Sequence, residues 1–208
     1  LGPNGAGKST SFKMMCGLAK PTGGTARIMG IDILENPSKA RSNLGYMAQK
    51  FSLYGNLTLR QNLEFFASVY GINFLNKDKR VDEIIDIFNF HDIQDMKSQD
   101  LPLGFKQRLS LACAVIHNPP ILFLDEPTSG VDVIARREFW NHITSLAKLG
   151  VTILVTTHFM DEAEYCNRIS LFYKGETIAL GTPYELKTKA KADNMEQAFV
   201  NLIKESGK

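Results

Sequence analysis

The feature that most constrains the fold is a glycine-rich segment at the start of the sequence. Residues 2–10 fit the pattern G-x-x-x-x-G-K-[ST], and a helix is predicted to follow over residues 9–18. Glycines let backbone N–H groups converge on phosphate oxygens, and the helix N-terminus adds the positive end of its dipole. The segment therefore predicts a site for a nucleoside triphosphate. It consists of Gly2, Pro3, Asn4, Gly5, Ala6, Gly7, Lys8, Ser9 and Thr10.

Two side chains of this segment carry specific chemistry. Lys8 is expected to reach the β- and γ-phosphates, and the hydroxyl of Ser9 is expected to ligate Mg²⁺. The alternative is a glycine-rich turn that does no more than begin a helix. Lysine followed by serine at these positions argues against that alternative.

A second constraint is a pair of acids at the end of an apolar run. Residues 121–124 read Ile-Leu-Phe-Leu between Pro120 and Asp125, which is typical of a buried parallel strand. Asp125 is expected to hold Mg²⁺ through water, and Glu126 to polarise the attacking water. In isolation these acids would also fit a solvated turn, but beside a phosphate-binding loop that interpretation is weaker.

The remaining pattern predicts an α/β chain with a helical middle. Thr58 and Gln61 have capping-box spacing, and Gly71 follows the expected end of that helix. Further helices are predicted over 81–88, 105–116, 133–149 and 195–203. Strands are predicted over 25–29, 44–47 and 151–156, with the last of these buried, and a hairpin over 169–180.

Composition narrows the class of protein. The net charge is +2, so no nucleic-acid partner is expected. No apolar run approaches the roughly 20 residues that cross a bilayer. Cys16, Cys113 and Cys166 are scattered, without metal-ligand spacing, and we interpret them as reduced residues in a cytosolic setting.

Taken together, the motifs resemble the ATP-binding domains of ABC transporters, in the family's order and over nearly the whole chain. Residues 2–10 resemble the Walker A motif, and 125–132 resemble a Walker B motif leading into the D-loop. Residues 46–49 resemble the Q-loop, which implies that Gln49 is a Mg²⁺ ligand and a lever between subdomains. Residues 156–158 resemble the switch segment, which implies that His158 contacts the γ-phosphate.

The resemblance implies the fold, the cofactors and the partners. It implies an α/β P-loop NTPase core with a mostly parallel sheet over 1–55 and 115–208, and an inserted helical subdomain over 56–114. It implies ATP and Mg²⁺ as ligands and ATP hydrolysis as the activity. The expected partners are a second ABC ATPase domain and transmembrane permease subunits, at the cytoplasmic face of the membrane. The family's N-terminal strands and adenine-stacking aromatic residue are expected to be missing from this sequence.

One motif departs from the family pattern. The family usually shows Leu-Ser-Gly-Gly-Gln before Lys-Gln-Arg, whereas residues 101–108 read Leu-Pro-Leu-Gly-Phe-Lys-Gln-Arg. Gly104 can still donate to a nucleotide held by the opposite subunit, but Pro102 offers neither a hydroxyl nor an N–H. Restoring Pro102→Ser with Phe105→Gln is expected to raise ATP-driven dimerisation. The variant resembles drug-exporter ATPases of the daunorubicin-resistance type, especially the second half of tandem ATPases.

Two alternatives remain open at this point. One is a non-transport ABC ATPase associated with ribosomes, although those translation factors usually carry Asn-His-Leu-Asp where this chain has residues 129–132, Ser-Gly-Val-Asp. The other is a nucleotide-gated half-site that binds ATP with weak turnover. The intact Lys8, Asp125, Glu126 and His158 argue against weak turnover at the chain's own site.

Overall fold

The computed structural model describes residues 1–206 and divides into two compact units. The terminal unit contains Leu1–Ala19 and the segment from Thr156 onward, and the central unit contains Lys20–Val155. The glycine-rich loop therefore lies in the terminal unit, and the acidic strand end lies in the central unit. Within residues 1–206, no helix combines the length and the hydropathy that crossing a membrane requires.

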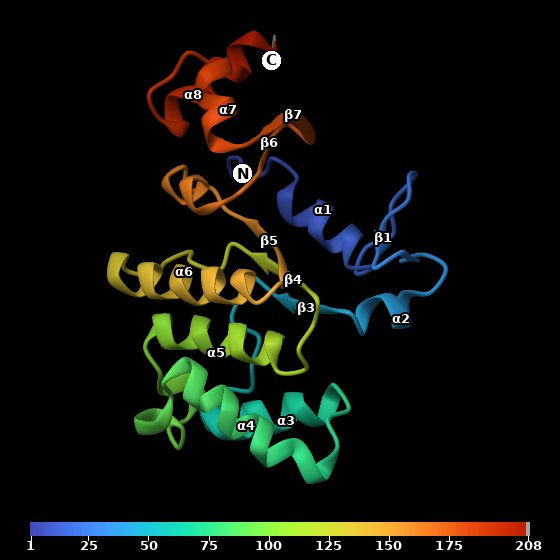
Figure 1. Cartoon of the computed structure of the whole chain (residues 1–208), viewed down its shortest axis with the longest axis vertical. Coiled ribbons are helices and arrows are strands. Elements are labelled where there is room, and N and C mark those ends of the chain that lie inside the picture. The colour runs from blue at the N-terminus through green and yellow to red at the C-terminus, as the bar shows by residue number, and fades with distance from the viewer. Residues whose placement is uncertain (207–208) are drawn as a thin grey trace. The chain divides into compact units, whose positions relative to one another are not determined.

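The terminal unit is built around an antiparallel hairpin. β6 (Ile169–Tyr173) pairs with β7 (Glu176–Gly181), and the two turn residues have positive φ angles of 48° and 82°, as tight hairpin turns require. Helix α1 (Lys8–Met15), the 3₁₀ turn η3 (Asp161–Tyr165), α7 (Pro183–Lys189) and α8 (Met195–Glu205) complete the unit (Figure 1). Its core is formed by apolar side chains of the hairpin, α7 and α8, including Ile169, Leu171, Leu186, Met195, Phe199 and Leu202.

The central unit contains a sheet with strand order β3-β4-β5. β3 (Leu44–Met47) and β4 (Ile121–Asp125) are parallel, with Leu44 opposite Ile121 and Met47 opposite Leu124. β5 (Thr152–Thr156) lies at the other side of β4, and α6 (Val133–Lys148) connects β4 with β5. The parallel pair confirms the predicted class of sheet, and it brings the ends of two distant segments to one edge.

Helices occupy the chain between β3 and β4. They are α3 (Leu59–Val69), α4 (Phe74–Phe88), the short η1 (His91–Ile93) and η2 (Ser98–Asp100), and α5 (Leu103–Val115). The capping box at Thr58 is present, because its side chain accepts from Gln61 N while the Gln61 side chain accepts from Thr58 N. The buried face predicted for the second helix is also confirmed, with Val81, Ile84, Ile85 and Phe88 at 2% exposure or less.

Several predictions about element bounds, burial and short elements were wrong, each for an identifiable reason. α1 ends at Met15 rather than at residue 18, because Gly17 adopts a φ of 67°. β1 (Arg27–Ile28) is shorter than predicted and pairs with the unpredicted β2 (Ile31–Asp32). β5 is half-buried rather than buried, since it lies at the edge of the three-stranded sheet. The short helices α2 (Pro37–Arg41) and α7, each with proline in its first turn, were not predicted.

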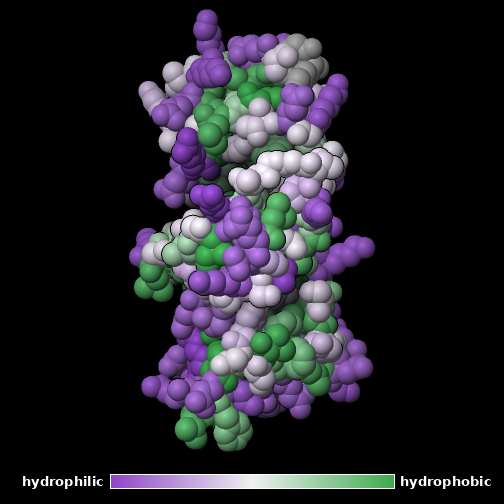
Figure 2. All heavy atoms as spheres, turned by 90° about the vertical axis from the view of Figure 1, so that its right-hand side faces the viewer, coloured by the Kyte–Doolittle hydropathy of each residue, from purple (hydrophilic) through white to green (hydrophobic). Residues whose placement is uncertain are grey.

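Helix α4 also begins earlier than predicted. It starts at Phe74 rather than at Val81, and its first turn presents Phe74 and Leu75 with 80% and 85% exposure. Hydrophobic side chains reach the surface at the end that holds α3 and α4 (Figure 2). An apolar pattern on an exposed turn does not follow the periodicity from which a buried face is predicted.

Candidate functional site

The glycine-rich loop has the conformation that its sequence predicted. Gly5 and Gly7 have φ angles of 80° and 96°, a region that residues with a Cβ rarely adopt. Gly7 is the N-cap of α1 and has no side chain with which to cap the helix, while Ala6 N donates to Pro3 O at 3.2 Å. The loop therefore leads directly into a helix N-terminus, the end of a helix whose dipole favours an anion.

The loop is supported by the β6–β7 hairpin of the same unit. A Cβ on Gly2 would lie 2.3 Å from the carbonyl oxygen of Phe172, and a Cβ on Gly7 would lie 3.3 Å from the Cα of Gly175. Gly175 N also donates to Ala6 O at 3.0 Å. The glycines thus serve close packing as well as phosphate access. This supporting role of the hairpin turn was not predicted from the sequence.

The side chain of Lys8 is hydrogen-bonded to the backbone of the loop that precedes it. It is 5% exposed, and its Nζ donates to Gly2 O at 2.7 Å and to Pro3 O at 3.0 Å. Two backbone carbonyl oxygens of the loop therefore hold the ammonium group against the glycine segment. A fixed cation beside converging amides is the arrangement that binds phosphate oxygens.

The predicted switch segment lies beside this loop. Gly2 N donates to Thr157 O at 3.3 Å, so residues from opposite ends of the chain meet in the terminal unit. Thr157 is 4% exposed, and its Oγ1 accepts from Phe159 N at 3.0 Å. This turn presents the half-buried ring of His158, which lies 4.2 Å from the Phe159 ring at a tilt of 35°. The structure therefore brings the segment of His158 to the segment of Lys8.

The two acids and Gln49 come together in the central unit. Asp125 and Glu126 are 3% and 5% exposed at the end of β4. Because β3 and β4 are parallel, Gln49 emerges at the same edge of the sheet, and its Nε2 donates to Glu126 Oε2 at 3.0 Å. Carboxylate and amide oxygens are ligands that Mg²⁺ accepts. Asp125 and Gln49 thus provide oxygen donors suited to this metal. Ser9, the third predicted ligand, belongs to the terminal unit.

Glu126 occupies an unusual backbone conformation. Its φ is 46°, a left-handed value that a glutamate adopts at a cost of about 1–3 kcal/mol. The Ser129 N–H donates to Glu126 O at 3.2 Å, which closes the turn after the strand. Such local strain clusters at functional positions, because the surrounding structure must impose it.

Gly104, predicted as a nucleotide-binding residue, also has a packing role. A Cβ at this position would lie 2.8 Å from the Cβ of Ala135 in the first turn of α6. That turn is capped by Asp132, whose Oδ1 accepts from Ile134 N and Ala135 N at 3.0 Å. Pro102 is the N-cap of α5 and makes no side-chain capping bond. Glycine is thus required where α5 approaches α6.

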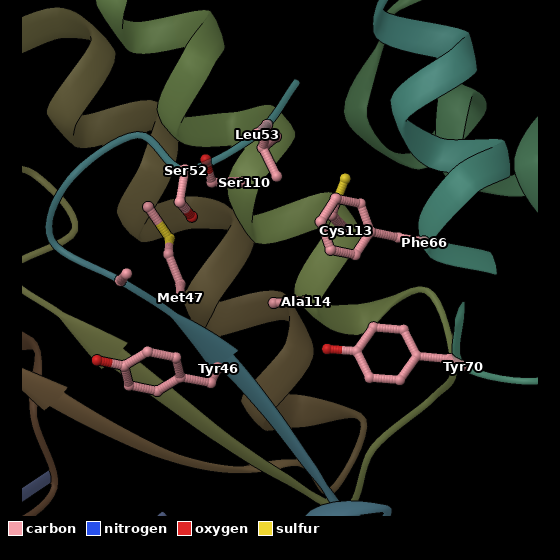
Figure 3. A pocket seen from close by; sticks show the side chains of 10 residues that line it. Tyr46, Met47, Ser52, Leu53, Phe66, Tyr70, Ser110, Cys113 and Ala114 are labelled. Carbon is pink, nitrogen blue, oxygen red and sulfur yellow. The ribbon is translucent and has the colours of Figure 1, made fainter. Parts of the chain in front are cut away.

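A small cavity in the central unit is distinct from these acids. It has a volume of about 50 Å³ and lies among β3, the loop after Gln49, α3 and α5. Its lining includes Phe66 and Tyr70 from the end of α3 and Cys113 and Ala114 from α5 (Figure 3). Pockets that hold drug-sized ligands have volumes of roughly 300 Å³ or more, so this cavity cannot hold a nucleotide.

Comparison with known proteins agrees with the motifs. The family model described as ABC transporter matches residues 1–129. The chain is 58% identical to the probable multidrug ABC transporter ATP-binding protein YbhF of Escherichia coli over 98% of its own length, which is 36% of that protein. It is 38% identical to the daunorubicin/doxorubicin resistance ATP-binding protein DrrA of Streptomyces peucetius, over 90% of this chain and 57% of that protein. The chain thus spans about a third of the length of YbhF.

A solved structure gives the same result for the fold. A dimeric ATP-binding cassette in a post-hydrolysis state, bound to ADP and Pi, matches with a TM-score of 0.77 and 28% identity, over 87% of this chain and 82% of that one. The P-loop NTPase fold of ABC ATPases is therefore confirmed. The chain belongs to the ABC transporter family as an ATP-binding domain similar to those of multidrug and drug-resistance transporters.

Proposed function

We propose that this domain binds ATP with Mg²⁺ and hydrolyses it to drive a multidrug exporter of the ABC-2 type. The observation that carries the proposal is the terminal unit's phosphate loop. There, Gly7 caps α1 in a left-handed conformation, Lys8 is fixed against the loop, and the segment of His158 hydrogen-bonds to Gly2. Family membership supports the assignment of this loop to ATP.

Each predicted residue has a role in this proposal. The amides of residues 2–10 and the ammonium of Lys8 bind the phosphates, and His158 contacts the γ-phosphate. The hydroxyl of Ser9, the amide oxygen of Gln49 and the carboxylate of Asp125 would hold Mg²⁺, which when bound neutralises charge on the phosphates. Glu126 accepts a proton from the attacking water.

The partners follow from the same proposal. The domain pairs with a second ABC ATPase domain, in the same chain or another, and with transmembrane permease components at the cytoplasmic face of the membrane. We also propose that it corresponds to the second half of a tandem ATPase, with a helical subdomain over 56–114 and the core over 1–55 and 115–208. The dimeric cassette with ADP and Pi supports pairing with a second ATPase domain, and the names of the drug-resistance relatives support the transporter partners.

A second candidate function is a half-site that completes a partner's nucleotide site only weakly. The observation favouring it is Pro102, the N-cap of α5, because proline supplies neither a hydroxyl nor an N–H to a nucleotide. The loss of one hydrogen bond to a charged group would weaken closure of the dimer roughly tenfold to a hundredfold.

Lys8→Ala tests the proposed function. The affinity for Mg²⁺-ATP should fall roughly tenfold to a hundredfold, because a charged hydrogen-bond donor to phosphate is lost. The matched control is Lys13→Ala, since Lys13 lies exposed on the same helix and should leave the affinity unchanged. Isothermal titration calorimetry measures both. Equal affinity of Lys8→Ala and the unmodified protein would contradict the proposal.

A further inference from the structure

The aromatic ring of Phe105 covers a buried guanidinium group in the central unit. Phe105 stands where the family usually has the glutamine of the signature motif, and its side chain is half-buried. The Cζ of Arg108 lies 4.6 Å from the centroid of its ring, within the range of a cation–π interaction. The ring of Phe105 thus packs on the side chain of Arg108, three residues further along α5.

Arg108 in turn connects α5 to two other parts of the unit. It is 9% exposed; its Nη2 donates to Phe88 O at 2.7 Å, and its Nη1 donates to Glu138 Oε2 at 3.1 Å. A second ring, that of Phe90, lies 5.4 Å from its Cζ. Arg108 therefore links α5 to the end of α4 and to α6, and the ring of Phe105 shields it at the beginning of α5.

The same end of α5 packs closely against the first turn of α6 and against the loop that precedes it. A Cβ on Gly104 would lie 2.8 Å from the Cβ of Ala135, and a Cβ on Gly130 would lie 3.3 Å from Leu103 Cδ2. Pro102 contributes no side-chain cap. The orientation of the first turn of α5 thus depends on packing at Gly104 and on the pair Phe105–Arg108.

We propose that Phe105 is a positioning residue, which acts through Arg108 to hold Gly104 and the first turn of α5 in the orientation needed to close on the partner's nucleotide. This inference rests on the proposed function, in which α5 caps a nucleotide across the dimer. It gives the variant motif a role: the aromatic ring fixes the helix by packing, where a glutamine would offer a polar group. It predicts that Phe105→Gln impairs closure, the opposite of the expectation from the family pattern.

The test uses steady-state ATP hydrolysis by the whole protein with its membrane partners. Phe105→Leu and Phe105→Gln should raise the KM for ATP roughly threefold to thirtyfold, the range of a cation–π interaction, and should leave kcat within about twofold, since neither change touches the reacting atoms. Phe105→Tyr retains the ring and should restore the KM of the unmodified protein. Thermal melting without nucleotide shows whether each variant folds. If Phe105→Leu fails to fold, Phe105→Met takes its place, since it keeps the bulk without the ring and should raise the KM in the same way.

A double-mutant cycle adds the dependence on Arg108. If Phe105 acts through Arg108, then Arg108→Met, which removes the cation, should raise the KM, and Phe105→Leu should add little to it. Additive effects would overturn the inference, and so would a KM that stays unchanged or falls in Phe105→Gln. A change in melting temperature with an unchanged KM would show a structural role only, and would also overturn it. If the unmodified protein does not hydrolyse ATP, the proposed function itself fails.

Discussion

At the scale of the residue, the contact between Gln49 and Glu126 links the predicted metal ligand to the predicted base. Gln49 Nε2 donates to Glu126 Oε2 at 3.0 Å, and Glu126 is 5% exposed with a φ of 46°. This hydrogen bond fixes the position of the Glu126 carboxylate relative to Gln49. If Glu126 is the general base proposed above, Gln49 is placed to orient its carboxylate.

Glu126→Gln should therefore separate binding from turnover. The amide oxygen of the new side chain can still accept from Gln49, so the local structure and the affinity for ATP should persist. Turnover should fall roughly a hundredfold to ten-thousandfold, the contribution of a positioned general base. The matched control is Glu35→Gln at an exposed glutamate, and a coupled ATPase assay measures both. An unchanged rate in Glu126→Gln would remove the assigned role.

The candidate site residues were named from the sequence, but the packing that requires glycine at two of these positions could not be predicted from it. Residues 2–10 and the pair Asp125–Glu126 follow from local motifs, because each motif is contiguous. The requirement for glycine at Gly2 and Gly104 also arises from Phe172 and Ala135, which lie far away in the sequence or in another helix. Only the folded chain shows these close approaches.

At the scale of the element, a buried amide joins the loop after Gln49 to the segment before α5. Asn62 is 0% exposed on α3, and its Oδ1 accepts from Tyr54 N at 3.0 Å. Its Nδ2 donates to Tyr54 O at 3.0 Å, to Thr58 O at 3.0 Å and to Ser98 Oγ at 3.2 Å. One side chain thus satisfies polar groups from three segments.

Asn62→Ala should destabilise the domain by about 2–4 kcal/mol, because it leaves buried donors and acceptors without partners. Asn76→Ala at an exposed position of α4 is the matched control, with an expected change of less than about 0.5 kcal/mol. Urea denaturation followed by circular dichroism measures the free energy of unfolding. Equal stability of the two variants would show that the network contributes nothing.

Elements with a strong local signal could be predicted, and short elements could not. β3 has the predicted bounds, and the capping box of α3 and the hairpin β6–β7 are confirmed. These elements carry their own apolar pattern or turn residues. β2 has two residues and α2 has five, too few for a period to be recognised. The formation of β2 and α2 depends on the segments that pack against them, such as β1 for β2.

At the scale of the whole molecule, the order of the motifs predicted the P-loop fold, while the division into units could not be predicted. The terminal unit joins residues from both ends of the chain through backbone bonds such as Gly2 N to Thr157 O and Gly175 N to Ala6 O. A backbone N–H pairs with a carbonyl whatever the side chains are. Sequence patterns therefore carry little information on which distant segments pair.

The stability of the molecule should depend on pH through two histidines of the central unit. Burial is the largest cause that lowers the pKa of both His117 and His142, and the charges of Arg80 and Arg108 respectively lower it further. The ring of His117 stacks on Tyr70 at 3.7 Å, and that of His142 stacks on Phe88 at 4.6 Å. Both folded-state pKa values therefore lie below 6.5, the ordinary value for histidine.

The sign of the effect follows from proton linkage. Below pH 6.5 the unfolded chain binds protons at these histidines more readily than the folded chain does, so the free energy of unfolding decreases as the pH falls. The urea midpoint should therefore be lower at pH 5.5 than at pH 7.5. This whole range lies more than about one pH unit above the usual carboxylate pKa values. His142→Phe keeps a ring against Phe88 but cannot be protonated, so it should reduce the difference between the two midpoints. If the difference remains the same in this variant, His142 is not a source of the pH dependence.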